Sequence, residues 1–158
     1  MNIITVDHVA LTVPDLESAT DFFARAFQAR TVLDAISKEG EPWGGKDAEI
    51  LFGMPQGGRI RARRVLNMGG DVNVELFQFE GTEHQRPPHT YDYGVQHFAV
   101  RVEDLQKTAR DFVKAGGKLY QSPDFTEAVL NGSGPDQGWL YGETPWGSVI
   151  EMVTFKEA

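Results

Sequence analysis

The apolar residues of this chain follow two spacings, one typical of strands and the other of helices. Two segments, which begin after Asp15 and Asp104, place apolar residues three and four positions apart, as one face of an amphipathic helix requires. Asp15 and Asp104 are suited to cap these helices, and Gly116 and Gly117 to end the second one. Short runs that alternate, or that are continuously apolar, predict strands. They lie at 7–11, 30–33, 60–66, 73–77, 96–100, 118–120, 138–142 and 149–153.

The second half of the chain repeats the order of elements in the first half. An offset of 89 residues (97 − 8) places His8 over His97, and an offset of 76 (151 − 75) places Glu75 over Glu151. The first half is therefore longer by 13 residues (89 − 76). We assign these extra residues to an inserted loop, rich in glycine and charge, at 37–58. Internal repetition of this kind predicts two copies of one structural unit.

Each copy contains one strand, one helix and three further strands. We predict an α+β fold of two paired βαβββ modules, the first at 1–80 and the second at 94–158, that together form one domain. Residues 81–93, rich in proline, histidine and charge, form the predicted linker.

Four of the predicted strands carry an imidazole or a carboxylate at a central position, which is costly to bury without a partner. These residues are His8, Glu75, His97 and Glu151, one His and one Glu from each module. The first and last strands of a βαβββ unit can lie close together, so both side chains of a module can face one concave side. Two imidazoles and two carboxylates suit one divalent ion of Zn, Ni, Co, Mn or Fe, whereas a calcium site would use oxygen ligands only. We expect His84 and His89 of the linker to be solvated, or to lie at the rim of the site.

Composition narrows the classes of partner. The 158 residues include 41% hydrophobic side chains, enough for a core, and a net charge of −8 argues against nucleic acid and anionic membranes as partners. No apolar stretch is long enough to span a bilayer, and the N-terminus shows no signal-peptide pattern. The chain has no cysteine. We expect a cytoplasmic protein, and exposed sheet edges favour a homodimer.

The motifs around the four residues resemble those of the vicinal-oxygen-chelate superfamily, also called the glyoxalase/bleomycin-resistance/dioxygenase superfamily. The resemblance covers the chain except for the loop at 37–58. Its motifs are Asp7-His8-Val9-Ala10-Leu11-Thr12-Val13 with Asp15-Leu16, Val74-Glu75-Leu76-Phe77, Gly94-Val95-Gln96-His97-Phe98-Ala99-Val100 with Asp104-Leu105, and Thr144-Pro145-Trp146-Gly147 before Ile150-Glu151.

The resemblance implies paired modules whose sheet forms a cup around a divalent metal, with His8, Glu75, His97 and Glu151 as ligands. It also implies a small-molecule substrate that is bound through two adjacent oxygens. This ligand set is similar to that of glyoxalase I and related isomerases. Methylmalonyl-CoA epimerases usually hold Gln where this chain has Glu75.

The reaction that best uses these parts is proton abstraction next to a carbonyl, through an enediolate stabilised by the metal. Glu151 is the favoured base, and Glu75 is the other candidate for proton transfer. Return of the proton to the opposite face would make the protein an epimerase, and return to the adjacent carbon a glyoxalase-type isomerase or lyase. No glutathione-binding cluster is recognisable, so lactoylglutathione is not the expected substrate.

Other residues are candidates for contact with the substrate. Arg61 and Arg63 alternate on one strand, and their guanidinium groups would suit a carboxylate or phosphate, although a solvated strand face explains them as well. Trp139, Tyr141 and Phe77 are spaced to line the cup with aromatic rings, or to pack in the core. The segment at 43–45 is a candidate lid.

Three other functions fit the same fold. An extradiol dioxygenase would use iron held by two His and one Glu, and a fosfomycin-type thiol transferase also uses three ligands. In both cases Glu75 would occupy a position that has to be open. A metal-free drug-binding protein of the bleomycin-resistance type would leave all four polar residues unexplained.

Overall fold

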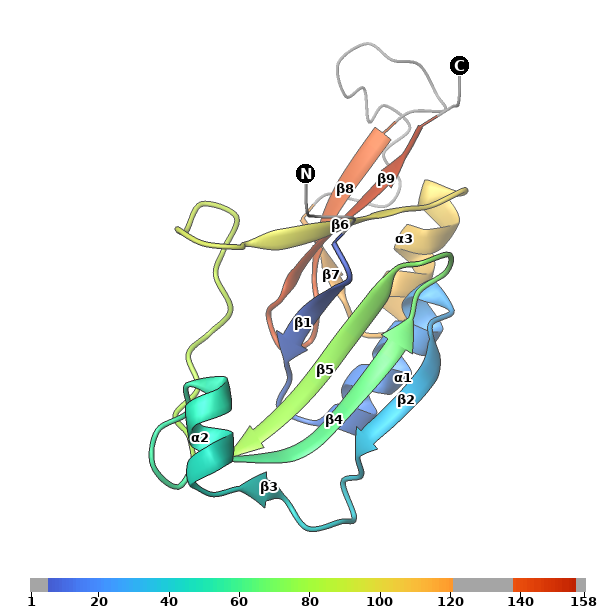
Figure 1. Cartoon of the computed structure of the whole chain (residues 1–158). Coiled ribbons are helices and arrows are strands. Elements are labelled where there is room, and N and C mark those ends of the chain that lie inside the picture. The colour runs from blue at the N-terminus through green and yellow to red at the C-terminus, as the bar shows by residue number, and fades with distance from the viewer. Residues whose placement is uncertain (1–5, 121–137, 156–158) are drawn as a thin grey trace, which may run out of the picture. The chain divides into compact units, whose positions relative to one another are not determined.

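The structure, a computed structural model, describes residues 6–120 and 138–155. Its contacts divide the chain into two compact units. The first unit contains residues 1–24 and 28–85, and the second contains residues 25–27 and 86–158. Figure 1 shows the elements of both. In chain order they are β1 (His8–Thr12), α1 (Leu16–Phe27), β2 (Arg30–Ile36), β3 (Trp43–Gly44), α2 (Lys46–Phe52), β4 (Arg59–Asn67), β5 (Asn73–Glu80), β6 (His97–Arg101), α3 (Leu105–Lys114), β7 (Lys118–Leu119), β8 (Gly138–Glu143) and β9 (Val149–Thr154).

The sheets of the two units have the same strand order. In the first unit the order is β1-β5-β4-β2, with β3 paired to β4, and in the second it is β6-β9-β8-β7. In both sheets the first strand pairs in parallel with the last, and the other pairings are antiparallel. The repeat extends to the register, because Ala10 lies opposite Glu75 in one sheet and Ala99 lies opposite Glu151 in the other. The prediction of an α+β fold built from two βαβββ modules is confirmed.

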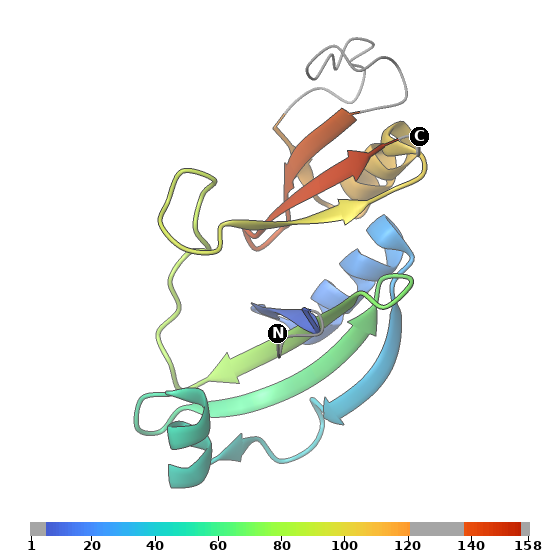
Figure 2. The ribbon, with the colours of Figure 1, turned by 45° about the horizontal axis from the view of Figure 1, so that its top comes forward.

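Alternation along β5 decides which side chains are available to a site. Val74 and Leu76 are fully buried, and α1 lies along one face of this sheet (Figure 2). Phe22 and Phe23 of the helix are also fully buried, and each such side chain stabilises the fold by roughly 1.5–3 kcal/mol. Because neighbouring residues of a strand point to opposite faces, Glu75 points away from the helix.

The second unit packs its helix in the same way, with Phe112 at the centre. Phe112 of α3 is fully buried. A Cβ at Gly117 or Gly142 would collide with the Phe112 ring, so both positions require glycine. Leu140 and Ile150 supply the sheet side of this core. The apolar stripe predicted for this helix is therefore core packing.

Both predicted helix caps are confirmed. Asp15 accepts a hydrogen bond from the backbone N–H of Ser18, and Asp104 accepts one from the N–H of Lys107, each at 2.8 Å. Gly116 follows the second helix with a φ of +106°, a left-handed conformation that glycine adopts readily. The first helix ends differently, at Gln28, which takes the left-handed conformation itself.

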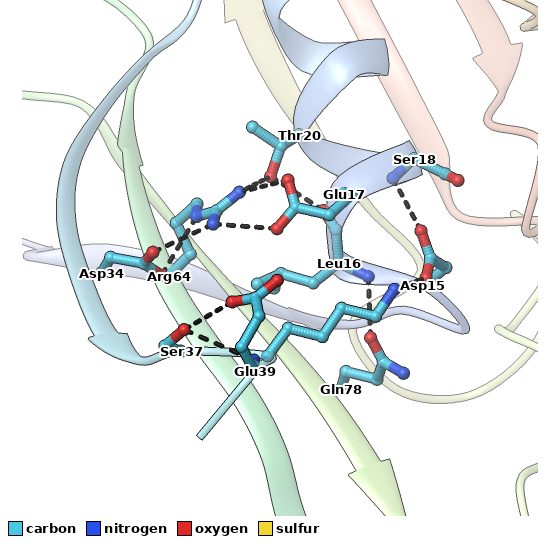
Figure 3. A network of polar contacts seen from close by, with 11 residues as sticks. Asp15, Leu16, Glu17, Ser18, Thr20, Asp34, Ser37, Glu39, Arg64 and Gln78 are labelled. Carbon is cyan, nitrogen blue, oxygen red and sulfur yellow. Dashed lines mark hydrogen bonds and ion pairs between the residues drawn. The ribbon is translucent and has the colours of Figure 1, made fainter.

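A polar network joins α1 to the neighbouring strands on the helix side of the first sheet (Figure 3). Arg64 of β4 forms ion pairs with Glu17 of the helix and Asp34 of β2. Hydrogen bonds to these carboxylates raise the pKa of Arg64 above its ordinary value. Lys38 forms an ion pair with Asp15, and this contact and the Ser18 N–H lower the pKa of Asp15 to about 2. These contacts tie the start of the helix to β2 and β4.

The sequence predicted an inserted loop at 37–58. The structure places β3 and α2 in this segment, so the prediction is wrong in that part. The helix has no side-chain N-cap, and its large apolar residues Ile50, Leu51 and Phe52 are consecutive. The helical spacing that identified the other two helices is therefore missing here. No helix in the described ranges is long and apolar enough to cross a membrane.

Candidate functional site

In the first unit, His8 and Glu75 form a close pair across two parallel strands. Their side chains approach at 3.2 Å, from Nε2 of His8 to Oε2 of Glu75. The Glu75 side chain is only 7% exposed, whereas His8 is exposed. Nδ1 of His8 is 2.7 Å from a carboxylate oxygen of Asp7. This contact orients the ring so that Nε2 faces Glu75.

Arg63 holds the second oxygen of Glu75. Its Nε donates to Oε1 at 2.6 Å, and its Nη2 contacts the same oxygen. Arg63 lies opposite Phe77 in the β4–β5 register, with its guanidinium 5.6 Å from the centre of the Phe77 ring. Glu75 is thus a nearly buried carboxylate whose charge is matched by a permanent cation.

The sequence predicted that Arg61 and Arg63 could together bind a carboxylate or phosphate of the substrate. In the structure Arg61 has other partners. Its guanidinium pairs with Glu80 at 2.9 Å and donates to the carbonyl of Gly40 at 3.0 Å. Arg59 pairs with the same glutamate. Arg61 therefore ties the start of the inserted segment to β4, and its contact with substrate stays a prediction.

In the second unit, His97 and Glu151 form the equivalent pair. Nε2 of His97 is 3.2 Å from Oε2 of Glu151, the same two atoms and the same distance as in the first pair. Both side chains are partly buried, and Nδ1 of His97 contacts the side-chain oxygen of Gln96. The amide of Gln96 thus takes the place that the carboxylate of Asp7 has in the first unit.

Tyr141 is the partner of Glu151, as Arg63 is the partner of Glu75 in the first unit, but the side chain of Tyr141 is neutral. It lies directly opposite Glu151 in the β8–β9 register and is hydrogen-bonded to it. Burial, followed by the charge of Glu151, raises the pKa of Tyr141 above its ordinary value, so its hydroxyl is a donor at neutral pH. Its ring meets the His97 ring edge-to-face, 5.2 Å between centres. Trp139 is on the same side of β8 and is half-buried.

The donor atoms fit a divalent metal. Two ligands about 2.1 Å from one ion, at right angles, are about 3 Å apart, close to the separation within each pair. Nitrogen and carboxylate oxygen are also the ligands that zinc and its first-row neighbours accept. In the described part of the chain, no three His, Asp or Glu side chains form a group that could hold a metal ion. Each unit thus offers two ligands, and their convergence on one ion stays a prediction.

The linker histidines are engaged outside these pairs. His84 is exposed and contacts Thr82 at 3.4 Å. His89 contacts Asp92 and stacks on the ring of Tyr91. These contacts lie within the linker, and a place for either histidine at the rim of the site stays a prediction.

Two kinds of residue near the pairs escaped the sequence analysis. Asp7 and Gln96 each precede the histidine of their unit, and that shared position was the available signal. Phe52 and Phe79 contact the Phe77 ring, at 5.8 Å and 5.5 Å between centres. Nothing in the local pattern indicated that α2 would contact β5.

Comparisons with known proteins identify the family and the fold of this chain. A 2-epi-5-epi-valiolone epimerase from Actinomyces sp is 28% identical over 154 residues, which cover 95% of this chain and 79% of the relative. Among solved structures, a glyoxalase family protein from Bacillus cereus superposes with a TM-score of 0.75 at 18% identity, over 97% of this chain and 95% of that one. A mutant of the fosfomycin resistance protein FosX from Listeria monocytogenes, complexed with Mn(II) and 1S,2S-dihydroxypropylphosphonic acid, superposes with a TM-score of 0.59 at 12% identity, over 98% and 92% of the two chains.

The two solved structures have the same fold as this chain. The family model of the Glyoxalase/Bleomycin resistance protein/Dioxygenase superfamily matches residues 5–151, nearly the whole chain. The chain therefore belongs to the Glyoxalase/Bleomycin resistance protein/Dioxygenase superfamily.

Proposed function

We propose that this protein is a metal-dependent epimerase that inverts a carbon next to a carbonyl by removing and returning its proton. The observation that carries the proposal is the repeated His–Glu pair, with Nε2 and Oε2 3.2 Å apart in both units. The relative from Actinomyces sp, an epimerase by name, favours this reaction over a glyoxalase-type isomerase or lyase. By the same likeness, the substrate is a small molecule with adjacent oxygens.

His8, Glu75, His97 and Glu151 would together hold one divalent ion of Zn, Ni, Co, Mn or Fe. When bound, such an ion withdraws electron density from a carbonyl oxygen and lowers the cost of negative charge beside it. The two units then have to bring their pairs to one place, within one chain or between two.

We assign different tasks to the two carboxylates. A proton on Glu75 would leave the guanidinium of Arg63 without a compensating negative charge, because the guanidinium stays charged. Glu151 has the neutral hydroxyl of Tyr141 as its partner, so it can accept a proton without breaking an ion pair. Glu151 is therefore the base that removes the proton from carbon, and Glu75 is the carboxylate that keeps its charge. A proton delivered to the opposite face, ultimately from solvent, completes the inversion.

Deuterium uptake from heavy water tests the reaction class. The metal-loaded protein is incubated with 2-epi-5-epi-valiolone, with open-chain α-hydroxy ketones and with acyl thioesters, and each is examined for deuterium next to its carbonyl. We expect uptake and inversion in at least one of these classes, and neither with the Glu151→Gln variant. A protein that retains its metal and exchanges no proton in any class contradicts the proposal.

A second candidate is a metal-free ligand-binding protein of the bleomycin-resistance type, which belongs to the same superfamily. Metal analysis of the purified protein separates the two readings, because the epimerase requires about one ion for each set of four ligands. Analytical ultracentrifugation of the same sample tests the expected homodimer, and the cytoplasmic location stays a prediction.

A further inference from the structure

An aromatic cluster extends the site of the first unit along the inserted segment. We name Trp43, Phe52, Phe77 and Phe79 the ring cluster. Trp43 and Phe52 meet edge-to-face at 5.5 Å between centres, Phe52 and Phe77 at 5.8 Å, and Phe77 and Phe79 stack at 5.5 Å. Trp43 and Phe52 come from β3 and α2, the elements within the extra segment of the first half.

The ring cluster begins beside the proposed metal ligand. Phe77 is two residues along β5 from Glu75, so both side chains lie on the face that does not pack against α1. Arg63 connects them, because it binds the carboxylate of Glu75 and lies over the Phe77 ring. Figure 1 shows α2 and β3 at the end of the sheet where β5 finishes and β4 begins.

The outer rings of the cluster stay partly exposed. Phe77 is 8% exposed, whereas Trp43 is 41% and Phe52 37% exposed. The helix α1 and the side chains buried beneath it lie on the opposite face of the sheet. Aromatic side chains are common in the lining of small-molecule sites.

The charges near the cluster narrow the class of ligand. Arg59 and Arg61 pair with Glu80, and Arg63 pairs with Glu75. A phosphate-rich acyl thioester would have to compete with these carboxylates and with a net charge of −8. A neutral ring that carries hydroxyl groups has no such competition, because its C–H face can pack on an aromatic ring while its oxygens point to polar groups.

We propose that Trp43, Phe52 and Phe77 form a wall that packs against the ring of a cyclic polyhydroxylated ketone and selects it over open-chain acyl thioesters. This inference rests on the proposed function and names its substrate class. Trp43 and Phe52 are specificity-determining residues in this scheme, and they take no part in proton transfer.

Kinetics of two single variants test the wall. Trp43→Ala and Phe52→Ala are each expected to raise KM for 2-epi-5-epi-valiolone about 10-fold or more, since a lost apolar contact is worth about 10- to 200-fold in discrimination. Metal content and kcat should change much less. The matched control is Ile50→Ala on the same helix, because Ile50 is 71% exposed and lies outside the cluster. Its KM should stay within about twofold of the wild-type value.

The tests separate failure of the wall from failure of the proposed reaction. If the wild-type protein exchanges the proton of the ring ketone and both alanine variants keep its KM, the wall is overturned. The wall is also overturned if KM rises equally in Ile50→Ala. Binding of the ring ketone to metal-loaded protein is measured by calorimetry, with Phe52→Leu as a milder variant if Phe52→Ala does not fold. Weaker binding in Trp43→Ala and Phe52→Leu supports the wall even if no proton exchange occurs, whereas unchanged binding overturns it.

Discussion

The two His–Glu pairs have the same geometry within the pair and different chemistry around it. In both, Nε2 and Oε2 are 3.2 Å apart on a parallel pair of first and last strands. Around the first pair stand charged groups, Arg63 on Glu75 and Asp7 on His8. Around the second stand neutral groups, Tyr141 and Gln96. The repeated backbone therefore gives both pairs the same geometry, while the neighbouring side chains give the two carboxylates different electrostatic surroundings.

The largest expected effect comes from neutralising one carboxylate at a time. Glu151→Gln is expected to lower kcat about 10²- to 10⁴-fold, because it removes the proposed base. Glu75→Gln is expected to lower metal affinity, with a smaller loss of kcat once metal is saturating. Steady-state kinetics over a range of metal concentrations measures both effects. Equal losses of kcat at saturating metal would contradict the division of tasks.

Removal of one imidazole from each unit tests whether the pairs share an ion. His8→Ala and His97→Ala are both expected to reduce bound metal well below one ion per site. Loss of a residue that only orients a metal ligand lowers metal affinity about 10- to 100-fold, and loss of the ligand itself should lower it further. Elemental analysis after gel filtration measures the metal. His84→Ala is the control and should retain it. Metal loss in only one of the two variants would argue against a common ion.

The partners of the two carboxylates predict unequal losses of stability. Arg63→Met leaves the nearly buried charge of Glu75 without its cation, and we expect it to cost about 1–3 kcal/mol, a value reduced for the partial exposure of Arg63. Tyr141→Phe removes one neutral hydrogen bond and should cost about 0.5–1.5 kcal/mol. Urea denaturation of the metal-free proteins compares them. A larger cost for Tyr141→Phe would reverse the proposed asymmetry.

The smallest expected effect contrasts the two helix caps. Asp15→Ala should lower the free energy of unfolding by about 1 kcal/mol for the lost cap and by a few tenths more for the ion pair with Lys38. Asp104→Ala should lower it by the contribution of the cap alone. Because the pKa of Asp15 falls from 3.8 to about 2 on folding, its ionised form stabilises the fold fully above about pH 4. The greater stability of the wild-type protein relative to Asp15→Asn should therefore decrease as the pH drops towards 2. Urea denaturation at pH 6 and at pH 3 measures this, and a pH-independent difference would contradict it.

Much of the fold and the four proposed ligands of the candidate site were predictable because their signals are local. Alternation identified the strands that bear His8 and Glu151, and the spacing of Phe22 and Phe23 identified the first helix. The helix α2 was missed because it has neither a side-chain cap nor the spacing of an amphipathic face. Its rings find their partner in Phe77, which is 25 residues beyond Phe52 in the chain.

By itself, the sequence determined the repeat, the order of the strands and helices, and the positions of His8, Glu75, His97 and Glu151 within them. Periodicity and capping depend on neighbours a few residues away, so they can be read along the chain. Only the tertiary structure decided that Glu75 has Arg63 as its partner and Glu151 has Tyr141. Those contacts depend on the register of one strand against another, and a shift of one residue would turn each side chain to the opposite face.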